Sequence, residues 1–395
     1  MDQVLKILVA PDSFKESLSA EEVAEAMRMG AMDAAQVMAR GVEVDVCPVA
    51  DGGEGTVNAL VRAMGGEVRR SEVTEPLGRR IVARWGLCGE TGIVEMAEAA
   101  GLGLLSEGER NPMRTTTYGV GLLLKEAMDA GAKRIIMGIG GSATNDGGCG
   151  AAQALGVVFY DNGGEIIEQQ ISGGLLGKVS RIDVEGLDER LKNGEVKLEV
   201  ACDVRNVFCG EHGAARVYGW QKGANAVEIG ELDAWMLQLG ALMARDCGVD
   251  VMGMAGAGAA GGLGGGAVAM LKGALRSGIE LVLEAVDFEQ RVQWADVVIS
   301  GEGKMDGQTS EGKVLWGVER ACERVGRPMW VVVGAVGTGV DLGAGNGGHQ
   351  EGMKGGMQGG IAVSEGHERG WAMVHAKELV REGTARIVKN VLATF

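Results

Sequence analysis

The stretch "LKILVAPDSFKESLSA" at residues 5–20 contains the unit from which the fold is built. Its apolar run at 5–10 predicts a buried strand, which Pro11 ends. Ser19 and Glu22 have the spacing of a capping box, so a helix is expected to begin near residue 20. The apolar positions of that helix recur at helical spacing: Val23, Ala26, Met27, Gly30, Ala31 and Ala34.

The same pattern returns at 42–64 and in the last hundred residues. Residues 42–46 alternate like a strand, and the loop "PVADGGEGT" leads into a helix over 56–64. The tail adds further elements, namely strands at 296–300, 329–333 and 361–363, a helix ending near 325 and a closing helix at 372–392. Strands that alternate with helices predict a parallel sheet. Both ends of the chain are therefore expected to form one five-stranded domain, residues 1–65 and 291–395.

The middle of the chain has a different pattern, which predicts an inserted α/β domain with mixed strands at 66–290. Three segments within 67–99 indicate antiparallel strands, "EVRRSEVTEPL", "RRIVARWGLC" and "GIVEMAEAA". The remaining elements expected here are helices at 115–131, 148–156 and 227–247 and a strand at 133–137. A chain of 395 residues is long enough for two such domains.

Charge, cysteine spacing and apolar stretches exclude several classes of partner. The net charge is −16 and no run of Lys and Arg occurs, which argues against a nucleic-acid partner. The seven cysteines are widely spaced without a CxxC pair, as is typical of reduced thiols. No signal peptide precedes the first strand, so a cytoplasmic protein is expected. The uncharged stretch 251–271 contains eight glycines and is expected to be a buried loop and helix, with no membrane partner.

The stretch "GIGGSATNDGG" at 138–148 follows a predicted buried strand and places five glycines around small polar side chains. Such a loop leaves its backbone open to close approach. We expect an anion to reach its N–H groups, with Ser142, Asn145 and Asp146 facing that anion or its metal.

Similar loops follow other predicted strands, and each combines acidic, amide or basic side chains with glycine. The candidate residues are Asp12, Ser13 and Lys15; Asp51, Gly52, Gly53 and Glu54; Ser142, Asn145 and Asp146; Asp203, Arg205 and Asn206; Lys222; and Glu302, Lys304, Asp306 and Thr309. Any single loop of this kind is as often a helix cap. Together they offer what phosphoryl transfer requires, which is carboxylates for Mg²⁺, lysines for phosphate and glycines that admit it.

Other motifs are weaker. Residues 256–261 fit G-x-G-x-x-G, but no good strand precedes them, so NAD binding is disfavoured against a phosphate-contacting helix start. No Walker or protein-kinase motif is present, and four histidines leave little room for a Ser-His-Asp site. A non-enzymatic protein that binds small molecules or nucleotides remains the alternative to an enzyme.

Several of these segments resemble the bacterial glycerate kinases of the glycerate 2-kinase type. They are "ILVAPDSFKESLSA" (7–20), "PVADGGEGTV" (48–57), "NPMRTTTYGVG" (111–121), "GIGGSATNDGG" (138–148), "ACDVRNVF" (201–208), "WQKGA" (220–224), "GAGAAGGLGGG" (256–266) and "SGEGKMDGQTSEGKV" (300–314). The resemblance covers residues 5 to about 335. Leu315 and Trp316 depart from it, and so does the glycine-rich insert 337–360, for which a linker is favoured over a lid.

The resemblance implies a flavodoxin-like domain from both chain ends, an inserted α/β domain and an active site in the cleft between them. It also implies ATP as co-substrate, Mg²⁺, D-glycerate as substrate and 2-phosphoglycerate as product. The choice of hydroxyl rests on the resemblance alone, and the oligomeric state stays open.

For such a kinase, we expect Asp203 to be the base that accepts the hydroxyl proton. Asp12 and Asp51 are its rivals or else ligands of Mg²⁺. Lys15 and Lys222 are expected to neutralise phosphate or substrate charge.

Overall fold

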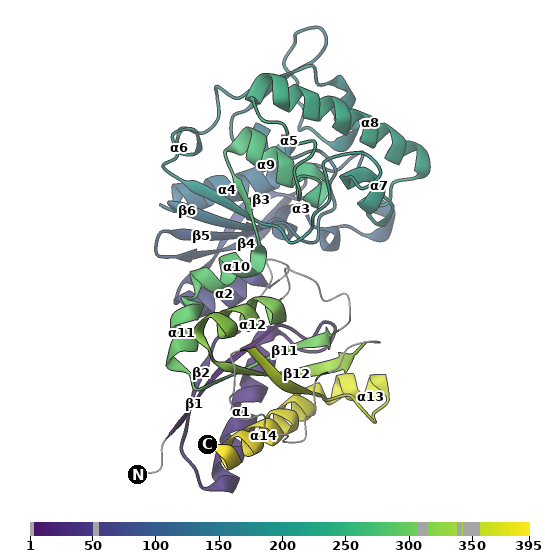
Figure 1. Ribbon diagram of the computed structural model, residues 1–395. Coiled ribbons are helices and arrows are strands. Elements are labelled where there is room, and N and C mark those ends of the chain that lie inside the picture. Colours follow the sequence, from purple (N-terminus) through teal and green to yellow (C-terminus); the bar gives the residue numbers. More distant parts are fainter. Residues whose placement is uncertain (1–3, 50–54, 306–313, 338–341, 343–355) are drawn as a thin grey trace. The chain divides into compact units, whose positions relative to one another are not determined.

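The computed structural model describes residues 4–49, 55–305, 314–337, 342 and 356–395 (Figure 1). The chain divides into two compact units, Met1–Asp51 with Ile279–Phe395, and Gly52–Gly278. These limits lie some way from residues 65 and 290, where the sequence places the domain boundaries, and those boundaries stay a prediction.

The first unit contains a parallel sheet in the order β13-β12-β11-β1-β2. Its strands are β1 (Leu5–Pro11), β2 (Val42–Val46), β11 (Val297–Met305), β12 (Pro328–Val336) and β13 (Gly356–Ala362). Counted along the chain, this order is 2-1-3-4-5, which is that of the flavodoxin-like fold. The predicted flavodoxin-like sheet made from both chain ends is confirmed.

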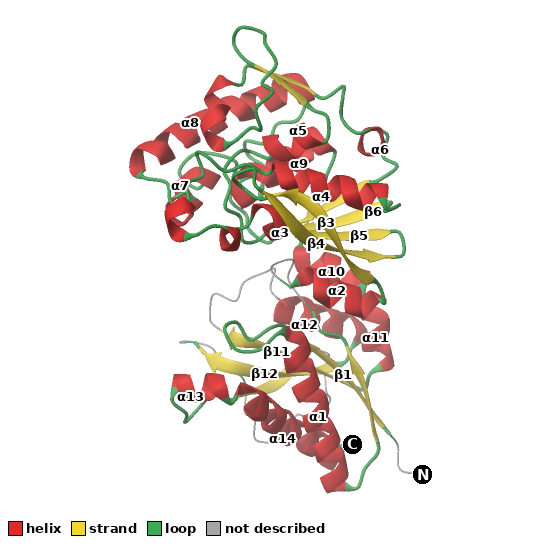
Figure 2. Cartoon of the chain, turned by 180° about the vertical axis from the view of Figure 1, so that it is seen from behind, coloured by secondary structure: helices red, strands yellow, loops and turns green. Residues whose placement is uncertain are grey.

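Helices cover both faces of this sheet (Figures 1 and 2). Helices α1 (Ala20–Met38) and α14 (Ala376–Thr394) pack together on one face, and α11 (Phe288–Trp294) and α12 (Val314–Val325) on the other. The capping box of Ser19 and Glu22 is present, and the predicted apolar stripe of α1 is buried. Gly30 lies in that stripe because a Cβ there would come within 2.2 Å of the Arg381 carbonyl oxygen on α14.

Two strands of the first unit extend into segments that the sequence indicates to be loops. Strand β11 continues to Met305 because its end pairs with β12, up to the pair Met305↔Val336. Strand β13 begins at Gly356, inside the stretch expected to be a linker. Glycine is rare in strands, but here it permits close contact: a Cβ on Gly360 would lie 2.3 Å from Cγ2 of Val331. The closing helix is also different, since α13 (Arg369–Val374) precedes α14 as a separate helix.

The second unit contains a mixed sheet in the order β10-β9-β6-β5-β4-β3. Its strands are β3 (Glu67–Thr74), β4 (Arg80–Cys88), β5 (Thr91–Glu95), β6 (Arg134–Gly138), β9 (Lys197–Ala201) and β10 (Ala274–Arg276). Strands β3, β4 and β5 pair antiparallel, and the other neighbours are parallel. This confirms the predicted mixed α/β unit. A small hairpin-like pair, β7 (Val158–Tyr160) and β8 (Arg181–Asp183), lies apart from this sheet.

The helices of the second unit are α2 (Thr56–Met64), α3 (Ala97–Ala100), α4 (Tyr118–Asp129), α5 (Cys149–Ala154), α6 (Glu189–Lys192), α7 (Ala214–Tyr218), α8 (Ala226–Leu242) and α9 (Leu263–Leu271). The helix α10 (Gly278–Ala285) begins at Gly278, the last residue of the second unit, and continues into the first. The segment "GIVEMAEAA" is a strand only as far as Glu95, after which α3 follows. The expected helix 227–247 ends at Leu242 and continues as a turn of π-helix.

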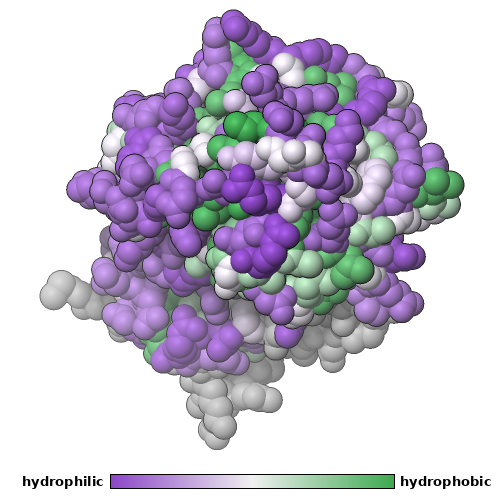
Figure 3. Space-filling model, turned by 90° about the horizontal axis from the view of Figure 1, so that it is seen from above, coloured by the Kyte–Doolittle hydropathy of each residue, from purple (hydrophilic) through white to green (hydrophobic). Residues whose placement is uncertain are grey.

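The uncharged stretch 251–271 forms turns and then the nine-residue helix α9, as expected. Within the described ranges, no helix is both long and apolar enough to cross a membrane. The face shown in Figure 3 is mostly hydrophilic, with hydrophobic residues in small separate groups. All seven cysteines are free thiols, as their spacing predicts.

Candidate functional site

In the first unit, the predicted residues after β1 lie at the carboxyl end of the sheet. The Asp12 N–H donates to the Gly301 carbonyl on β11 at 2.8 Å, which holds this loop against the neighbouring strand. The Asp12 carboxylate accepts from the Ser13 N–H at 2.6 Å and from Ser13 Oγ at 3.3 Å. Lys15 is exposed. Carboxyl ends of parallel strands are where α/β sheets bind ligands.

Glu302 and Lys304 also lie at the carboxyl end of the sheet. They belong to the strand β11 itself rather than to a loop after it. The Glu302 side chain is buried and Lys304 is exposed. Gly303 between them lies close to the β1 loop, since a Cβ there would be 3.1 Å from Cα of Phe14. The structure thus brings together five predicted residues of this unit: Asp12, Ser13, Lys15, Glu302 and Lys304. The other candidates expected nearby lie outside the described residues: Asp51, Gly52, Gly53, Glu54, Asp306 and Thr309.

In the second unit, the loop after β6 is buried together with its polar side chains. Ser142, Asn145 and Asp146 are each at most 6% exposed. Segment 110–117 runs beside this loop, as shown by the Thr115 hydroxyl, which donates to the Ala143 carbonyl at 2.9 Å. A buried polar loop of this kind is costly to fold unless its groups are paired.

Asp146 is the best paired of these residues. Its carboxylate accepts from the N–H and the hydroxyl of Thr117, both at 2.7 Å, and from the N–H groups of Gly148 and Gly150. Burial raises the pKa of the Asp146 carboxyl, and these hydrogen bonds oppose the increase. Asp146 therefore organises the loop from inside, and its oxygens already have donors without a ligand.

The glycines of this loop also serve packing, and two of its N–H groups have partners within the chain. The N–H of Gly147 donates to the Gly261 carbonyl, and that of Gly148 donates to Asp146, so neither is open to an anion. The segment 256–266 approaches this loop so closely that its own glycines have no room for a side chain. A Cβ on Gly266 would lie 2.1 Å from the Gly147 oxygen, and one on Gly261 would lie 1.9 Å from the Thr144 oxygen. Gly261 is also the last glycine of the disfavoured NAD motif at 256–261, so this packing contact accounts for it.

Asn145 is the exception among the buried groups. Its side chain is 0% exposed, and neither Oδ1 nor Nδ2 has a hydrogen-bond partner among the residues that the structure describes. An unsatisfied buried amide costs about 1–3 kcal/mol per group, so natural proteins seldom keep one without a use. A ligand with both a donor and an acceptor, such as a hydroxy acid, would satisfy it.

Lys222 reaches the same loop from the short helix Trp220–Lys222. It is 2% exposed, and its Nζ donates to the Thr144 carbonyl at 2.6 Å and to Ser142 Oγ at 3.3 Å. Burial lowers the pKa of the Lys222 ammonium to about 7, while the charge of Asp146 acts in the opposite direction. An anion bound next to this buried lysine would raise its pKa again and so favour the charged ammonium form.

The pKa of Lys222 predicts a pH-dependent stability. An unfolded lysine has a pKa of about 10.4, so between pH 7 and 10 the unfolded chain binds a proton that the folded chain has lost. The free energy of unfolding should therefore rise with pH across this window, by at most about 1.4 kcal/mol per pH unit. Urea unfolding of wild type and Lys222→Met at pH 7, 8 and 9 measures the difference, with the exposed Lys133→Met as control. Equal pH slopes in wild type and Lys222→Met would contradict the assignment.

Asp203 and Arg205 lie in the loop after β9, at the same sheet edge as the loop after β6. Asp203 Oδ1 accepts from Ser277 Oγ at 3.1 Å and from the Gly278 N–H at 2.9 Å, where α10 begins. The carboxylate is half-buried and Arg205 is exposed. Asn206 nearby has a structural role, because its amide oxygen accepts from the Tyr218 hydroxyl at 2.6 Å.

The sequence interpretation missed Glu95, the last residue of β5. Its carboxylate is 6% exposed and accepts from the Val57 N–H at 2.7 Å and the Gly55 N–H at 3.3 Å. Burial raises the pKa of this carboxyl. Glu95 therefore anchors the first residues of α2, the helix that follows the predicted loop 51–54 in the sequence. An acidic residue at the carboxyl end of an apolar strand was the available signal.

The described residues contain no group of three His, Cys, Asp or Glu side chains that could hold a metal ion. Mg²⁺ in phosphoryl-transfer sites commonly needs only one or two carboxylates, with phosphates and waters as the other ligands. Asp12, directly after β1 at the carboxyl end of the sheet, could supply one such carboxylate.

Comparison with known proteins is consistent with this geometry. The model of the glycerate kinase family matches residues 7–389, well beyond the limit near 335 expected from the motifs. Glycerate kinase of Bacillus subtilis is 48% identical, with 84% of this chain and 85% of that protein covered. Glycerate 2-kinase of Escherichia coli is 44% identical, with 84% and 86% covered.

A crystal structure assigned to glycerate kinase 2 of Salmonella typhimurium LT2 is 40% identical. It superposes with a TM-score of 0.84 over 99% of this chain and 98% of that one. From its sequence, its two sheets and these likenesses, the chain belongs to the glycerate kinase family of phosphotransferases.

Proposed function

We propose that this protein transfers the γ-phosphoryl group of ATP to a hydroxyl of D-glycerate, forming 2-phosphoglycerate. The observation that carries the proposal is Asn145, a buried amide without a partner beside the buried Lys222, in a chain of this family. The relatives named above act on glycerate by their names. The non-enzymatic alternative does not account for membership of a kinase family.

The roles of the polar groups follow from their charge and place. In the second unit, Lys222, Ser142 and Asn145 bind the anionic substrate, and Asp146 fixes their loop. In the first unit, Lys15 and Lys304 neutralise the phosphates of ATP, and Asp12 with Ser13 takes the metal or a phosphate oxygen. Mg²⁺, when bound with the nucleotide, would offset charge on the phosphates. The remaining predicted residues, Arg205 and Glu302, are assigned to phosphate or substrate binding.

Asp203 is the proposed general base. It would orient the attacking hydroxyl and accept its proton as the hydroxyl oxygen bonds to phosphorus in line with the departing ADP. The hydrogen bonds from Ser277 and Gly278 fix one of its oxygens, so the carboxylate is held in a defined orientation.

A coupled assay of ADP release tests the proposed activity. It should be run with ATP and Mg²⁺ over D-glycerate, L-glycerate, lactate and glycerol, with D-glycerate expected to be the preferred acceptor. ATP binding without ADP release above background for any of these acceptors would support the non-enzymatic alternative.

A further inference from the structure

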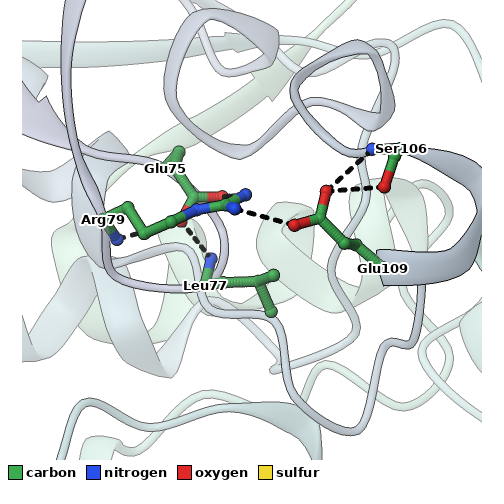
Figure 4. Close-up of polar contacts among 5 residues, drawn as sticks. All are labelled: Glu75, Leu77, Arg79, Ser106 and Glu109. Carbon is green, nitrogen blue, oxygen red and sulfur yellow. Dashed lines mark hydrogen bonds and ion pairs between the residues drawn. The ribbon is translucent and has the colours of Figure 1, made fainter.

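The backbone at Arg110 is held in place by contacts of the neighbouring residues, not by contacts of the Arg110 side chain. The preceding residue, Glu109, accepts from the N–H and hydroxyl of Ser106 and from the Arg79 guanidinium at 2.7 Å (Figure 4). Arg79 in turn pairs with Glu75, which is 2% exposed. This chain of contacts anchors the backbone just before Arg110, so the Arg110 side chain starts from a defined place.

Two close contacts place Arg110 beside the candidate substrate site. Gly223, next to Lys222, has φ +90°, and a Cβ on it would lie 2.2 Å from the Arg110 oxygen and 3.1 Å from the Arg110 Cβ. Two residues after Arg110, the Pro112 oxygen faces Gly173, whose added Cβ would lie 2.3 Å from it and 2.9 Å from the Asn145 oxygen. Arg110, Lys222 and Asn145 are therefore parts of one local cluster.

The Arg110 guanidinium is available to a ligand. Its Nε is buried and has no hydrogen-bond partner within the described part of the chain, and Arg110 is in none of the ion pairs found there. By contrast, Arg79 and Arg84 in the same unit are paired with Glu75, Glu109 or Glu98. Arg40 and Arg327 in the first unit also have a buried Nε without a hydrogen-bond partner. Arg110 differs from them in its place beside Lys222 and Asn145, where an anion from outside the chain can supply the missing partner.

We propose that Arg110 binds the carboxylate of the hydroxy-acid substrate and so decides that this kinase accepts an acid rather than a neutral polyol. This inference rests on the proposed function. A guanidinium presents two parallel N–H donors that match a carboxylate. The Asn145 amide and Lys222 then remain for the hydroxyl groups and the incoming phosphoryl charge. The proposal adds a specificity-determining residue to the groups named above.

Steady-state kinetics of Arg110→Ala test this assignment, with Arg110→Lys as the conservative variant. Arg114→Ala is the matched control, since Arg114 is an exposed arginine of the same loop. In Arg110→Ala the KM for D-glycerate should rise about 10- to 100-fold, the effect of losing hydrogen bonds between charged groups. The KM for ATP should stay within twofold, and discrimination between glycerate and glycerol should fall. Arg110→Lys should lie between, because it keeps the charge and loses the two-donor geometry.

The alternative outcomes separate this inference from the proposed function. An active wild type with an unchanged KM for glycerate in Arg110→Ala, or with a raised KM for ATP only, overturns the role of Arg110 alone. A wild type that forms no ADP with D-glycerate overturns both. Thermal unfolding should show similar midpoints for wild type and the Arg110 variants, because the Arg110 Nε has no hydrogen-bond partner to lose.

Discussion

Replacing Asp203 with asparagine is expected to lower kcat for D-glycerate by about 10²–10⁴-fold, the range for loss of a general base. Asparagine keeps an oxygen in place of Oδ1, so the bonds from Ser277 and the Gly278 N–H can persist. It also caps helices as well as aspartate does. The fold should therefore remain while the ability to take the proton is lost.

A matched control for this variant is Asp188→Asn. Asp188 caps α6 and accepts from the Arg190 N–H, away from the candidate residues. It should leave kcat unchanged, and both variants should retain the substrate KM within a few fold. A near-normal kcat in Asp203→Asn would remove the base role from Asp203 and return it to Asp12 or Asp51.

The second large effect is expected on stability, from Asp146→Ala. This change leaves the buried N–H groups of Thr117 and Gly150 without their acceptor. Each unsatisfied buried donor costs about 1–3 kcal/mol, so the free energy of unfolding should fall by about 2–6 kcal/mol. Total stabilities are about 5–15 kcal/mol, and the variant should therefore be close to unfolding at physiological temperature. Urea unfolding measures the loss.

Asp161→Ala provides the comparison. Asp161 also accepts from two backbone N–H groups, those of Gly163 and Glu165, but in an exposed turn where water can replace the lost acceptor. Its loss should change stability by less than about 1 kcal/mol. Equal losses in the two variants would contradict the view that burial makes Asp146 the organiser of its loop.

The elements governed by local patterns could be predicted from the sequence. Helix α1 has its capping box at Ser19 and its buried stripe as expected, because both depend on residues within a few turns. The parallel arrangement of the five strands follows from the alternation of strands and helices, whereas the flavodoxin-like arrangement was implied by the resemblance alone. The extension of β11 through Glu302 and Lys304 could not be predicted, because it depends on pairing with β12, and its glycines suggest a loop.

The sequence predicted which residues belong to the candidate site, but not which of them have hydrogen-bond partners within the chain. The sequence placed Ser142, Asn145 and Asp146 together, and the structure shows that one is fully paired and another has no partner. It could not show that Gly147 and Gly148 pack against residues 256–266, because that contact joins segments more than a hundred residues apart. Glu95 was missed because its partners, the N–H groups of Gly55 and Val57 at the start of α2, belong to a different element of the chain.

Identification of the reaction product tests the central claim most directly. Purified protein is incubated with ATP, Mg²⁺ and D-glycerate, and the organic acid is examined by proton-coupled phosphorus NMR. Phosphate coupled to the single C2 proton, which marks 2-phosphoglycerate, is the predicted result. Absence of any phosphorylated glycerate, with the nucleotide intact, would contradict the assignment of this chain as an ATP-dependent glycerate kinase.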